Sequence, residues 1–416
     1  MNPINSKPFQ ISKQLVWEAW KTVKANAGSA GVDEESLEDF GANLKNNLYK
    51  IWNRMTSGSY MPPPVKGVAI PKKSGGQRLL GIPCVADRVA QAVVKLAFEP
   101  IVEEIFLSDS YGYRPNKSAH DAIDITRRRC WKYDWVIEFD IRGLFDNIRH
   151  DLLLKAVGQH TQCKWILLYI ERWLKVPMVM PDGTLKTRDK GTPQGGVVSP
   201  VLSNLFMHYV FDKWMETKHK RNPWCRYADD GLVHCNSYSE AQKHLDLLDQ
   251  RFKECGLELN SEKTKIVYCK DSSRQEDYPI TEFTFLGFTF CNRIAMNQYT
   301  KQVFNSFQPA VSKAALKAMR KQVKFQWRLH LRSDASLEEL AEKYNAVIRG
   351  WIQYYGKFYK TELSSLANYI NMRLVKWARR KYKSMKIHKQ RAYDWLVRVY
   401  NAKPTLFEYW KLFKVC

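Results

Sequence analysis

The sequence WCRYADDGLVHC, at residues Trp224–Cys235, places two adjacent aspartates between two apolar arms. The arms Trp224–Tyr227 and Leu232–Cys235 have the composition of β-strands, and the residues between them are typical of a turn, so we expect a β-hairpin. Asp229 and Asp230 lie at its tip, where two carboxylates repel each other unless a cation lies between them. An ordinary turn, in which Asp is a common residue, is the alternative interpretation.

A third carboxylate ends another expected strand. Residues Trp135–Asp140 alternate with the two-residue period of a strand, and a carboxylate at the end of a strand projects into a cleft. Three carboxylates from two strands hold two Mg²⁺ ions about 3.5–4 Å apart, a clamp that stabilises both oxygens of an in-line phosphoryl displacement. Mg²⁺ prefers oxygen ligands and substrate phosphates complete its shell. Asp140, Asp229 and Asp230 are therefore the candidate ligands for a pair of Mg²⁺ ions, for which Mn²⁺ is a substitute.

The remaining patterns predict a mixed first part and a helical second part. Helical spacing is found at 11–27, 36–55, 85–104, 199–214 and 239–255. Two further hairpins are expected, with arms at 68–73 and 77–82 and at 176–179 and 185–188, and 283–290 is an apolar, aromatic stretch. After about residue 300 the strand signals stop, so we expect a domain boundary between residues 291 and 305.

The net charge of +24 is concentrated near the C-terminus. Residues 301–416 contain 25 Lys and Arg against 7 Asp and Glu, a balance of +18, which leaves +6 for the first 300 residues. A basic region of this size predicts a polyanionic partner, and a solubilising charged face is the alternative. The nine cysteines form no CxxC pair, and the sequence contains neither a signal peptide nor an apolar run of membrane-spanning length. We expect a cytoplasmic protein without a membrane partner.

Four motifs occur in the order seen in reverse transcriptases: FDIRGLFDNI at Phe139–Ile148, GTPQGGVVSP at Gly191–Pro200, YADD at Tyr227–Asp230 and FLGF at Phe285–Phe288. Over most of its length the chain resembles the group II intron-encoded reverse transcriptase/maturases of bacteria. The resemblance implies an α+β fold, with right-hand polymerase fingers and palm, an antiparallel palm sheet, and an α-helical thumb/maturase domain after them. The order of the motifs favours a metal site over the ordinary turn.

The same resemblance implies a domain division. Residues 1–60 are then an N-terminal extension, 61–295 the reverse transcriptase fingers and palm, 300–370 the thumb/maturase domain, and 371–416 a basic segment that binds RNA or DNA. Many relatives carry a further endonuclease domain with Cys and His ligands, and this sequence has no His/Cys cluster of that kind. We therefore expect a protein that does not make its own second-strand nick.

The resemblance assigns the metal ligands residue by residue. It implies that Asp140 and Asp229 bind both metals, that Asp230 completes the acidic cluster, and that the backbone carbonyl of Ile141 is a further ligand. Asp146 lies in the same motif, six residues after Asp140, and we expect it to be a helix N-cap rather than a ligand.

It also assigns a set of residues to the incoming nucleotide: Lys72, Arg78, Phe145, Gln194 and Lys263. The two basic residues on the first hairpin resemble those that hold the triphosphate, with an exposed basic hairpin as the alternative and Lys73 in place of Lys72 if the register slips. Phe145 resembles the bulky residue that clashes with a ribose 2′-hydroxyl, although a core position suits it equally. Gln194 resembles a residue near the template base, and Lys263 one near the leaving pyrophosphate.

Phe285, Leu286 and Gly287 resemble the primer grip, in which an aromatic strand and its turn position the primer end. The alternative is an ordinary core strand.

The C-terminal part carries a fifth motif and a basic segment. Arg349–Gly356 (RGWIQYYG) resembles the signature of the maturase domain. Apolar and aromatic residues from Val347 to Tyr359 follow the spacing of one helix face, which suits a packed core face. Basic residues with interleaved aromatics suit phosphate contact and base stacking. The residues expected to bind RNA or DNA are Arg349, Arg373, Lys376, Arg379, Arg380 and Lys381.

These features predict an RNA-directed DNA polymerase that uses an RNA template, a DNA primer and dNTPs, and that also binds a group II intron RNA as a maturase. We expect it in the bacterial cytoplasm or nucleoid. The alternatives are a non-catalytic RNA-binding splicing cofactor, a domesticated reverse transcriptase in host defence or DNA repair, and an RNA-dependent RNA polymerase, against which Phe145 argues. The sequence does not predict the natural RNA, the priming mode, the fidelity or the oligomeric state.

Overall fold

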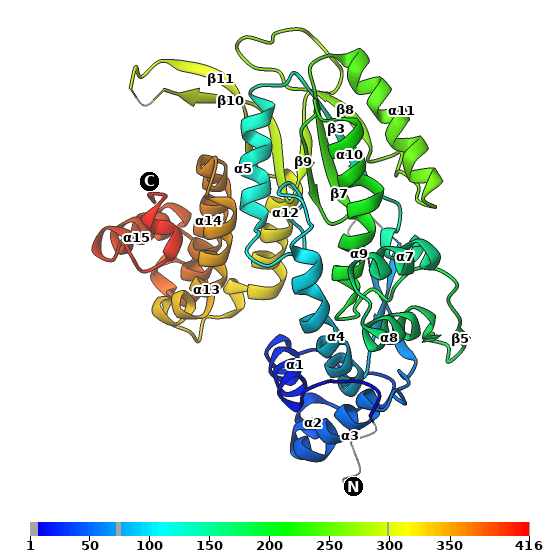
Figure 1. The fold of residues 1–416 in the computed structure, drawn as a ribbon. Coiled ribbons are helices and arrows are strands. Elements are labelled where there is room, and N and C mark those ends of the chain that lie inside the picture. The colour runs from blue at the N-terminus through cyan, green and yellow to red at the C-terminus, as the bar shows by residue number, and fades with distance from the viewer. Residues whose placement is uncertain (1–6, 72–75, 298, 416) are drawn as a thin grey trace. The chain divides into compact units, whose positions relative to one another are not determined.

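The computed structural model describes residues 7–71, 76–297 and 299–415 (Figure 1). The chain divides into two compact units, and neither is a continuous segment. Unit 1 consists of Met1–Ala122 and Ile137–Lys265, and unit 2 consists of Ile123–Val136 and Ile266–Cys416. The predicted fold class is confirmed, because antiparallel sheets and helices alternate before about residue 311 and helices follow.

Helices make up much of unit 1: α1 Lys13–Asn26, α2 Leu37–Ala42, α3 Leu44–Thr56, α4 Val85–Glu103, α6 Leu144–Asn147, α7 His150–His160, α8 Lys164–Lys175, α9 Ser199–Met207, α10 Lys213–Lys218 and α11 Tyr238–Glu254. A π-helix, His208–Asp212, joins α9 to α10, and α5 (Ala119–Cys130) crosses the division between the units. The single helix expected at 36–55 is wrong. Asn43 leaves the helical conformation (φ −119°, ψ 39°) and separates α2 from α3.

The first sheet of unit 1 contains the two predicted hairpins. Strands β1 (Val65–Pro71) and β2 (Gln77–Ile82) pair antiparallel, and β4 (Met178–Val179) joins β1 in parallel and β5 (Leu185–Lys186) in antiparallel orientation. The strand order is β2-β1-β4-β5. A small apolar cluster of Val65, Val176 and Met178 lies under the junction of the two hairpins, which explains why they share one sheet.

The second sheet has the order β6-β7-β3-β8, and it carries the predicted carboxylates. Its strands are β6 (Trp224–Tyr227), β7 (Asp230–Cys235), β3 (Trp135–Asp140) and β8 (Lys265–Tyr268). Phe139 packs against Phe211 and Phe252, with ring centroids 5.1 and 5.6 Å apart. A side chain at Gly231 would overlap the Phe139 ring, so only glycine lets β7 lie this close to β3. Helix α11 lies alongside this sheet in Figure 1.

Unit 2 contains a three-stranded antiparallel sheet of β9 (Phe283–Phe285), β10 (Phe288–Met296) and β11 (Val303–Val311). The expectation that strands end at about residue 300 is therefore wrong, because β10 and β11 form one hairpin across residues 291–305. Phe290 and Phe307 are buried near its base, whereas Ile294 and Val303 are 64% and 67% exposed near its tip. The exposed apolar residues interrupt the alternation by which a half-buried strand is identified.

The rest of unit 2 is helical: α12 Lys313–Gln322, α13 Leu337–Tyr355, α14 Ser364–Lys381 and α15 Lys389–Ala402, with π- or 3₁₀-turns at Val323–Trp327, Leu329–Leu331, Lys360–Leu363, Lys383–Met385 and Glu408–Lys411. A capping box of Ser336 and Glu339 begins α13, which ends before Gly356. The predicted helix face therefore stops at Tyr355. Trp327 stacks on Tyr344 and Trp351 in the core. No helix among the described residues has the length and apolarity to cross a membrane.

Candidate active site

The two adjacent aspartates occupy a tighter turn than the sequence predicted. Tyr227 pairs with Asp230 in the β6–β7 ladder, so the turn consists of Ala228 and Asp229, and Asp230 is the first residue of β7. Ala228 adopts a left-handed conformation (φ 58°), which residues other than glycine rarely adopt. The turn therefore depends on surrounding contacts to hold Asp229 in place.

Asp140 ends β3 and lies in the same site. Its carboxylate accepts a hydrogen bond from the Lys263 ammonium (2.9 Å) and another from the Asn260 side-chain amide (3.0 Å). The backbone N–H of Asn260 also donates to the Asp140 carbonyl (2.8 Å), and Ile141 pairs with Leu259. The segment before β8 is therefore attached to the end of β3 by main-chain and side-chain contacts, and the structure brings Lys263 to the carboxylates.

The pKa values of Asp229 and Asp230 are both raised. Burial is the main cause of the raised pKa of Asp229, and the charge of Asp140 raises it further. Burial, then the charges of Asp229 and Asp140, raise the pKa of Asp230 to about 7. The hydrogen bond to Asp140 raises the pKa of Lys263 above its ordinary value. These effects show that Asp229 and Asp230 lie in a partly buried site beside the charge of Asp140.

The donor atoms suit a hard divalent cation in kind, because carboxylate and carbonyl oxygens are the ligands that Mg²⁺ prefers. Burial, together with neighbouring carboxylates, raises the pKa values of Asp229 and Asp230, and a bound cation would stabilise their charged forms. In the described part of the chain, however, no three His, Cys, Asp or Glu side chains converge closely enough to enclose an ion. Lys263 and Asn260 instead occupy the two oxygens of Asp140.

Gln194 connects two other residues of the predicted nucleotide site. The Arg78 guanidinium donates a hydrogen bond to the Gln194 side-chain carbonyl, and the Gln194 amide donates to the Asp146 carboxylate (3.0 Å). The expected N-cap role of Asp146 is wrong, because Gly143 is the N-cap of α6 and Asp146 lies inside this short helix. Its carboxylate instead orients Gln194. Lys72 and its alternative Lys73 lie outside the described residues.

Phe145 is buried, with 8% of its surface exposed, and its ring packs edge-on against Tyr113 at 6.4 Å. Burial, followed by the charge of Asp229, raises the pKa of Tyr113, which places this tyrosine near the carboxylates. The sequence prediction missed Tyr113 and Asn260. The only available signal for Tyr113 was the glycine before it, because a side chain at Gly112 would overlap the backbone of Ala228.

The residues expected to grip the primer form the β9–β10 turn in unit 2. Phe285 is buried, and Leu286 and Gly287 both have positive φ values (51° and 81°), so the turn is two residues long. The Tyr354 hydroxyl of α13 donates to the Leu286 carbonyl (2.9 Å). Phe285 is therefore a core-strand residue, as in the alternative interpretation. Leu286 and Gly287 form a half-buried turn that contacts α13.

Most of the expected RNA-binding residues already have partners within unit 2. Arg349 forms an ion pair with Glu408 (2.7 Å), and Arg373 donates to the Tyr369 hydroxyl. Three others donate to backbone carbonyls, namely Arg379 to Lys386, Arg380 to His330, and Lys381 to both Ser333 and Ala335. Lys376 is exposed on α14. The set therefore mixes residues that stabilise the fold with residues that face solvent.

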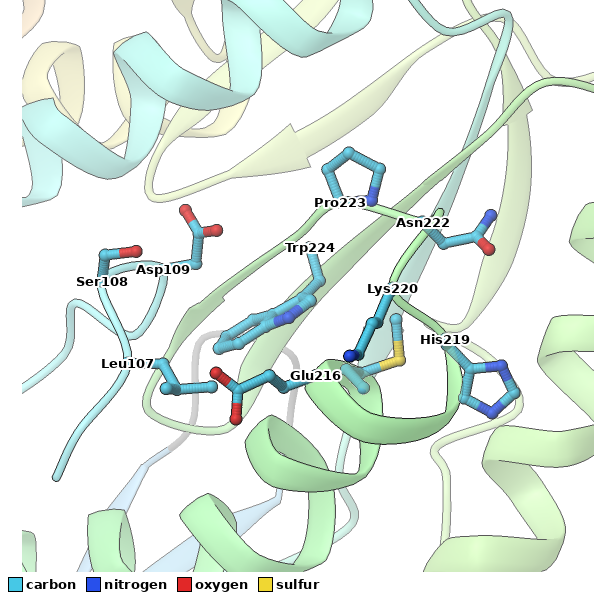
Figure 2. A pocket seen from close by; sticks show the side chains of 10 residues that line it. Leu107, Ser108, Asp109, Glu216, His219, Lys220, Asn222, Pro223 and Trp224 are labelled. Carbon is cyan, nitrogen blue, oxygen red and sulfur yellow. The ribbon is translucent and has the colours of Figure 1, made fainter.

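A polar pocket lies beside the beginning of β6 (Figure 2). It is lined by residues from the loop after α4 and from the α10–β6 connection: Leu107, Ser108, Asp109, Met215, Glu216, His219, Lys220, Asn222, Pro223 and Trp224. None of the residues predicted to bind metal, nucleotide or primer is among them. The carboxylate cluster is therefore a separate feature of unit 1.

Two family models match the chain. Residues 70–290 match the reverse transcriptase (RNA-dependent DNA polymerase) model, which covers more than half of the chain, and residues 316–395 match the group II intron maturase-specific domain. The first match contains Asp140, Asp229 and Asp230. The second contains α13 and α14.

Curated relatives agree with these matches. Protein YkfC of Escherichia coli is 30% identical over 301 residues, which are 63% of this chain and 75% of YkfC. The group II intron-encoded protein LtrA of Lactococcus lactis is 28% identical over 281 residues, 66% of this chain and 45% of LtrA. The putative COX1/OXI3 intron 1 protein of Saccharomyces cerevisiae is 30% identical over 217 residues, 51% of this chain and 26% of that protein. The chain thus matches less than half of either intron protein's length.

Proposed function

Because this chain belongs to the reverse transcriptase family, as a relative of the group II intron-encoded reverse transcriptase/maturases, we propose that it copies an RNA template into DNA and binds a group II intron RNA as a splicing maturase. Family membership supports an RNA-directed DNA polymerase in general, divalent metal ions and nucleic-acid binding. The observation that carries the catalytic half is the meeting of Asp140, Asp229 and Asp230 at one site, where burial and the charges of Asp229 and Asp140 raise the pKa of Asp230.

In the proposed site, Asp140 and Asp229 hold two Mg²⁺ ions, Asp230 completes the acidic cluster, and Ile141 offers its backbone carbonyl. When bound, the ions stabilise the attacking and leaving oxygens of the phosphoryl transfer. Because the Lys263 ammonium occupies one oxygen of Asp140, it must release that oxygen when an ion binds there. We propose that it then neutralises charge on the departing pyrophosphate.

The proposed nucleotide contacts come from the neighbouring residues. Arg78, together with Lys72, holds the triphosphate of the incoming dNTP, and Gln194 packs near the template base. Asp146 and Arg78 fix the two ends of the Gln194 amide, so its orientation is set before a nucleotide binds. Phe145 lies under the sugar and excludes the 2′-hydroxyl. In unit 2, the Phe285–Gly287 turn positions the primer end.

Primer extension tests the proposal. We would combine the full chain with an RNA template, an annealed DNA primer, Mg²⁺ and dNTPs, and compare the wild type with Asp229→Asn. Extension should be lost in the variant, because the amide cannot replace the carboxylate as a cation ligand. RNA binding should stay near the wild-type value, because it comes from the basic surface.

Asp182→Asn is the matched control for this experiment. Asp182 is exposed in the β4–β5 turn, and its carboxylate accepts hydrogen bonds from Thr184 only two residues away. The same substitution there should leave extension unchanged. A large loss of RNA binding in Asp229→Asn would contradict the separation of catalysis from binding.

A non-catalytic splicing cofactor is the second candidate function. It is favoured by the Lys263 and Asn260 contacts that fill both oxygens of Asp140. Absence of extension by wild type and variant, with intron RNA binding intact, would select it. A domesticated reverse transcriptase in host defence or DNA repair would instead extend primers and show no preference for an intron RNA.

Two finer proposals complete this assignment. We propose that residues 61–295 act as fingers and palm, 300–370 as thumb/maturase domain and 371–416 as a basic nucleic-acid-binding segment, after an N-terminal extension at 1–60. We also propose that the protein acts in the bacterial cytoplasm or at the nucleoid, which the two bacterial relatives support.

A further inference from the structure

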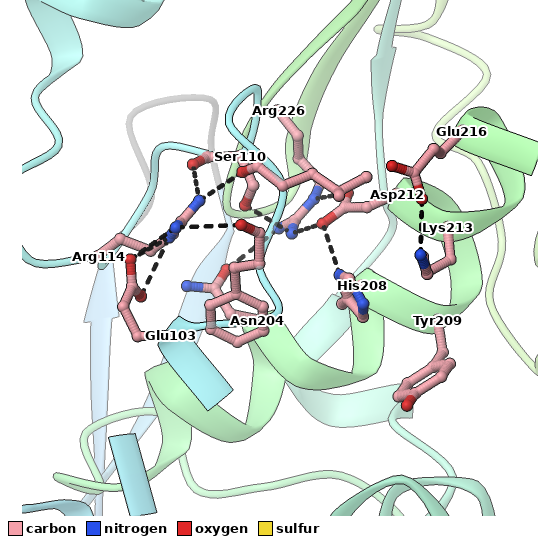
Figure 3. A network of polar contacts seen from close by, with 12 residues as sticks. Glu103, Ser110, Arg114, Asn204, His208, Tyr209, Asp212, Lys213, Glu216 and Arg226 are labelled. Atoms are coloured by element: carbon pink, nitrogen blue, oxygen red, sulfur yellow. Dashed lines mark hydrogen bonds and ion pairs between the residues drawn. The ribbon is translucent and has the colours of Figure 1, made fainter. Parts of the chain in front are cut away.

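Arg226 is a buried arginine whose every N–H group has a partner. Its side chain and that of Asp212 are both 0% exposed. A guanidinium has five N–H donors, and here Nε and Nη2 both donate to Asp212 (2.7 and 2.6 Å), Nη2 also donates to Ser110 Oγ (2.8 Å), and Nη1 donates to Asn204 Oδ1 (3.1 Å) and to the Ala228 carbonyl (3.0 Å). Figure 3 shows how these groups converge on the guanidinium.

One of these five bonds reaches the turn that carries Asp229. Ala228 has the left-handed conformation described above, which is unfavourable for a residue with a side chain. The bond from Arg226 fixes the carbonyl of the Ala228–Asp229 peptide. Rotation of that peptide would move Asp229, so the guanidinium restrains the direction in which the carboxylate projects.

A second chain segment is fixed by the same arginine. The backbone N–H of Arg226 donates to the Asp109 carbonyl (2.9 Å), and its carbonyl accepts from the Tyr111 N–H (2.8 Å). Asn204, which accepts from Arg226, also donates to the Gly112 carbonyl (2.7 Å). Because Gly112 lies against the backbone of Ala228, the segment 109–112 closes the other side of the turn.

Arg114 anchors this segment from the opposite end. It forms an ion pair with Glu103 (2.6 Å) and donates to the carbonyls of Leu107 (2.5 Å) and Ser110 (2.7 Å). Figure 3 shows the Arg114 and Arg226 groups on the two sides of Ser110. The turn is therefore backed by a segment that two arginines hold in place.

We propose that Arg226 is a positioning residue for Asp229, which it places by fixing the Ala228 carbonyl within a fully paired buried network. This inference rests on the proposed function only in assigning Asp229 to metal binding. A lysine retains the positive charge but has three donors on a flexible stem and cannot reproduce the fork that holds Asp212, Asn204 and Ala228 together. Charge alone is therefore insufficient, and Arg226→Lys is the informative substitution.

The test measures the turn and its metal binding without nucleic acid. In the full-length Arg226→Lys variant, hydrogen exchange of a peptide covering residues 224–235 should accelerate by about tenfold or more, as expected for loss of one hydrogen bond to a charged group. Mn²⁺ affinity, measured by electron paramagnetic resonance of the free ion, should fall by a similar factor. The apparent KM for Mg²⁺ in primer extension should rise. If Arg226 only stabilised the fold, the substitution would lower the amount of primer extended and leave this KM unchanged.

Arg88→Lys is the matched control, because Arg88 is a buried arginine of unit 1 that donates to the carbonyls of Ala27 and Ser29. It should leave exchange at 224–235 and Mn²⁺ affinity unchanged. If Arg226→Lys does not fold, Asn204→Ala replaces it. This variant keeps the Arg226–Asp212 pair and removes the side-chain oxygen that shares Arg226 Nη1 with the Ala228 carbonyl. It should change both readouts in the same direction by a smaller factor.

Hydrogen exchange and Mn²⁺ affinity decide the inference. Faster exchange confined to the turn together with weaker Mn²⁺ binding supports it. A folded Arg226→Lys with wild-type exchange and Mn²⁺ affinity overturns it, as does an unchanged Asn204→Ala where the lysine variant is unfolded. Failure of the wild type to extend a primer would refute the polymerase proposal alone, because the exchange and Mn²⁺ measurements require no catalysis.

Discussion

At the scale of single residues, Phe145 is held by contacts that leave its ring little freedom. Its ring meets Tyr113, and its backbone carbonyl accepts a hydrogen bond from Thr192 (2.7 Å). The backbone of Gly191 packs against the Phe145 carbonyl, because a Cβ atom added at Gly191 would lie only 2.8 Å from that oxygen. A ring fixed in this way is suited to exclude an extra hydroxyl by sterics rather than by hydrogen bonding.

We predict that Phe145→Ala relaxes discrimination against ribonucleotides. The ratio of kcat/KM for a dNTP to that for the matching rNTP, measured by single-nucleotide insertion, should fall by roughly 10- to 100-fold, the range that a pocket gains from steric exclusion. Phe145→Tyr keeps the ring and should retain the wild-type ratio. Unchanged sugar selectivity in the alanine variant would remove Phe145 from this role and leave it as a core residue.

Residues of the site differed in how far the sequence could predict them. Asp140, Lys263 and Gln194 lie within stretches that the resemblance singled out, and in the structure Lys263 donates to Asp140 and Gln194 donates to Asp146. Arg226 and Asn260 act through partners far away in the chain, such as Asn204 and Asp140. Hydrophobic periodicity carries no information on which polar residues meet across such separations.

At the scale of elements, the π-helix His208–Asp212 brings a buried histidine close to charged groups. Burial is the main cause that lowers the pKa of His208 to about 4, and the positive charges of Arg226 and Lys213 lower it further. Because 6.5 is its ordinary value, the imidazole is neutral in the fold at pH 7 and binds a proton more readily in the unfolded chain. Stability from this group is therefore fully present above about pH 6.5 and is lost as the pH falls towards 4.

We predict that His208→Gln makes unfolding less sensitive to acid. Urea unfolding at pH 7.5 and pH 4.5 should show that the wild type loses about 3 kcal/mol more than the variant over this range, since each pKa unit corresponds to about 1.4 kcal/mol. Carboxylates titrate in both proteins, so the difference between the two losses of unfolding free energy reports the contribution of the His208 imidazole. Equal losses would show that His208 accepts a proton in the folded protein without penalty.

The β10–β11 hairpin explains why the expected end of the strands was wrong while most elements were right. Strands such as β3, with alternating apolar residues in a buried sheet, were predicted with their observed limits. In the outer half of the hairpin, residues 303–305 of β11 are exposed and those of β10 are exposed or half-buried, so no fully buried face imposes a pattern. Short elements such as α6 follow from backbone contacts, for example Asp146 N–H to the Gly143 carbonyl, rather than from composition.

At the scale of the whole molecule, the charge of +24 predicts a salt-dependent affinity for RNA. The structure divides the basic residues of α14 into two kinds. Lys376 is exposed, whereas Lys381 donates to the carbonyls of Ser333 and Ala335 just before α13. The two lysines therefore serve as a matched pair on one helix.

We predict that Lys376→Ala weakens RNA binding similarly for all sequences and lowers the slope of log K against log salt by about 1, as loss of one phosphate contact requires. Lys381→Ala should instead lower the free energy of unfolding, because two carbonyls lose their donor. Fluorescence anisotropy at several salt concentrations and urea unfolding measure the two effects. An unchanged salt slope in Lys376→Ala would place the RNA on another surface.

The division of the chain into interleaved units has a consequence for how the protein is made. The early segment Ile123–Val136 belongs to unit 2. There Trp131 donates to the Phe307 carbonyl (3.0 Å), and Arg274 donates to the Tyr133 carbonyl (2.9 Å). During translation this segment leaves the ribosome long before Ile266 and the residues after it. Unit 2 therefore cannot fold as an autonomous C-terminal module, and its completion must wait for synthesis to pass through unit 1.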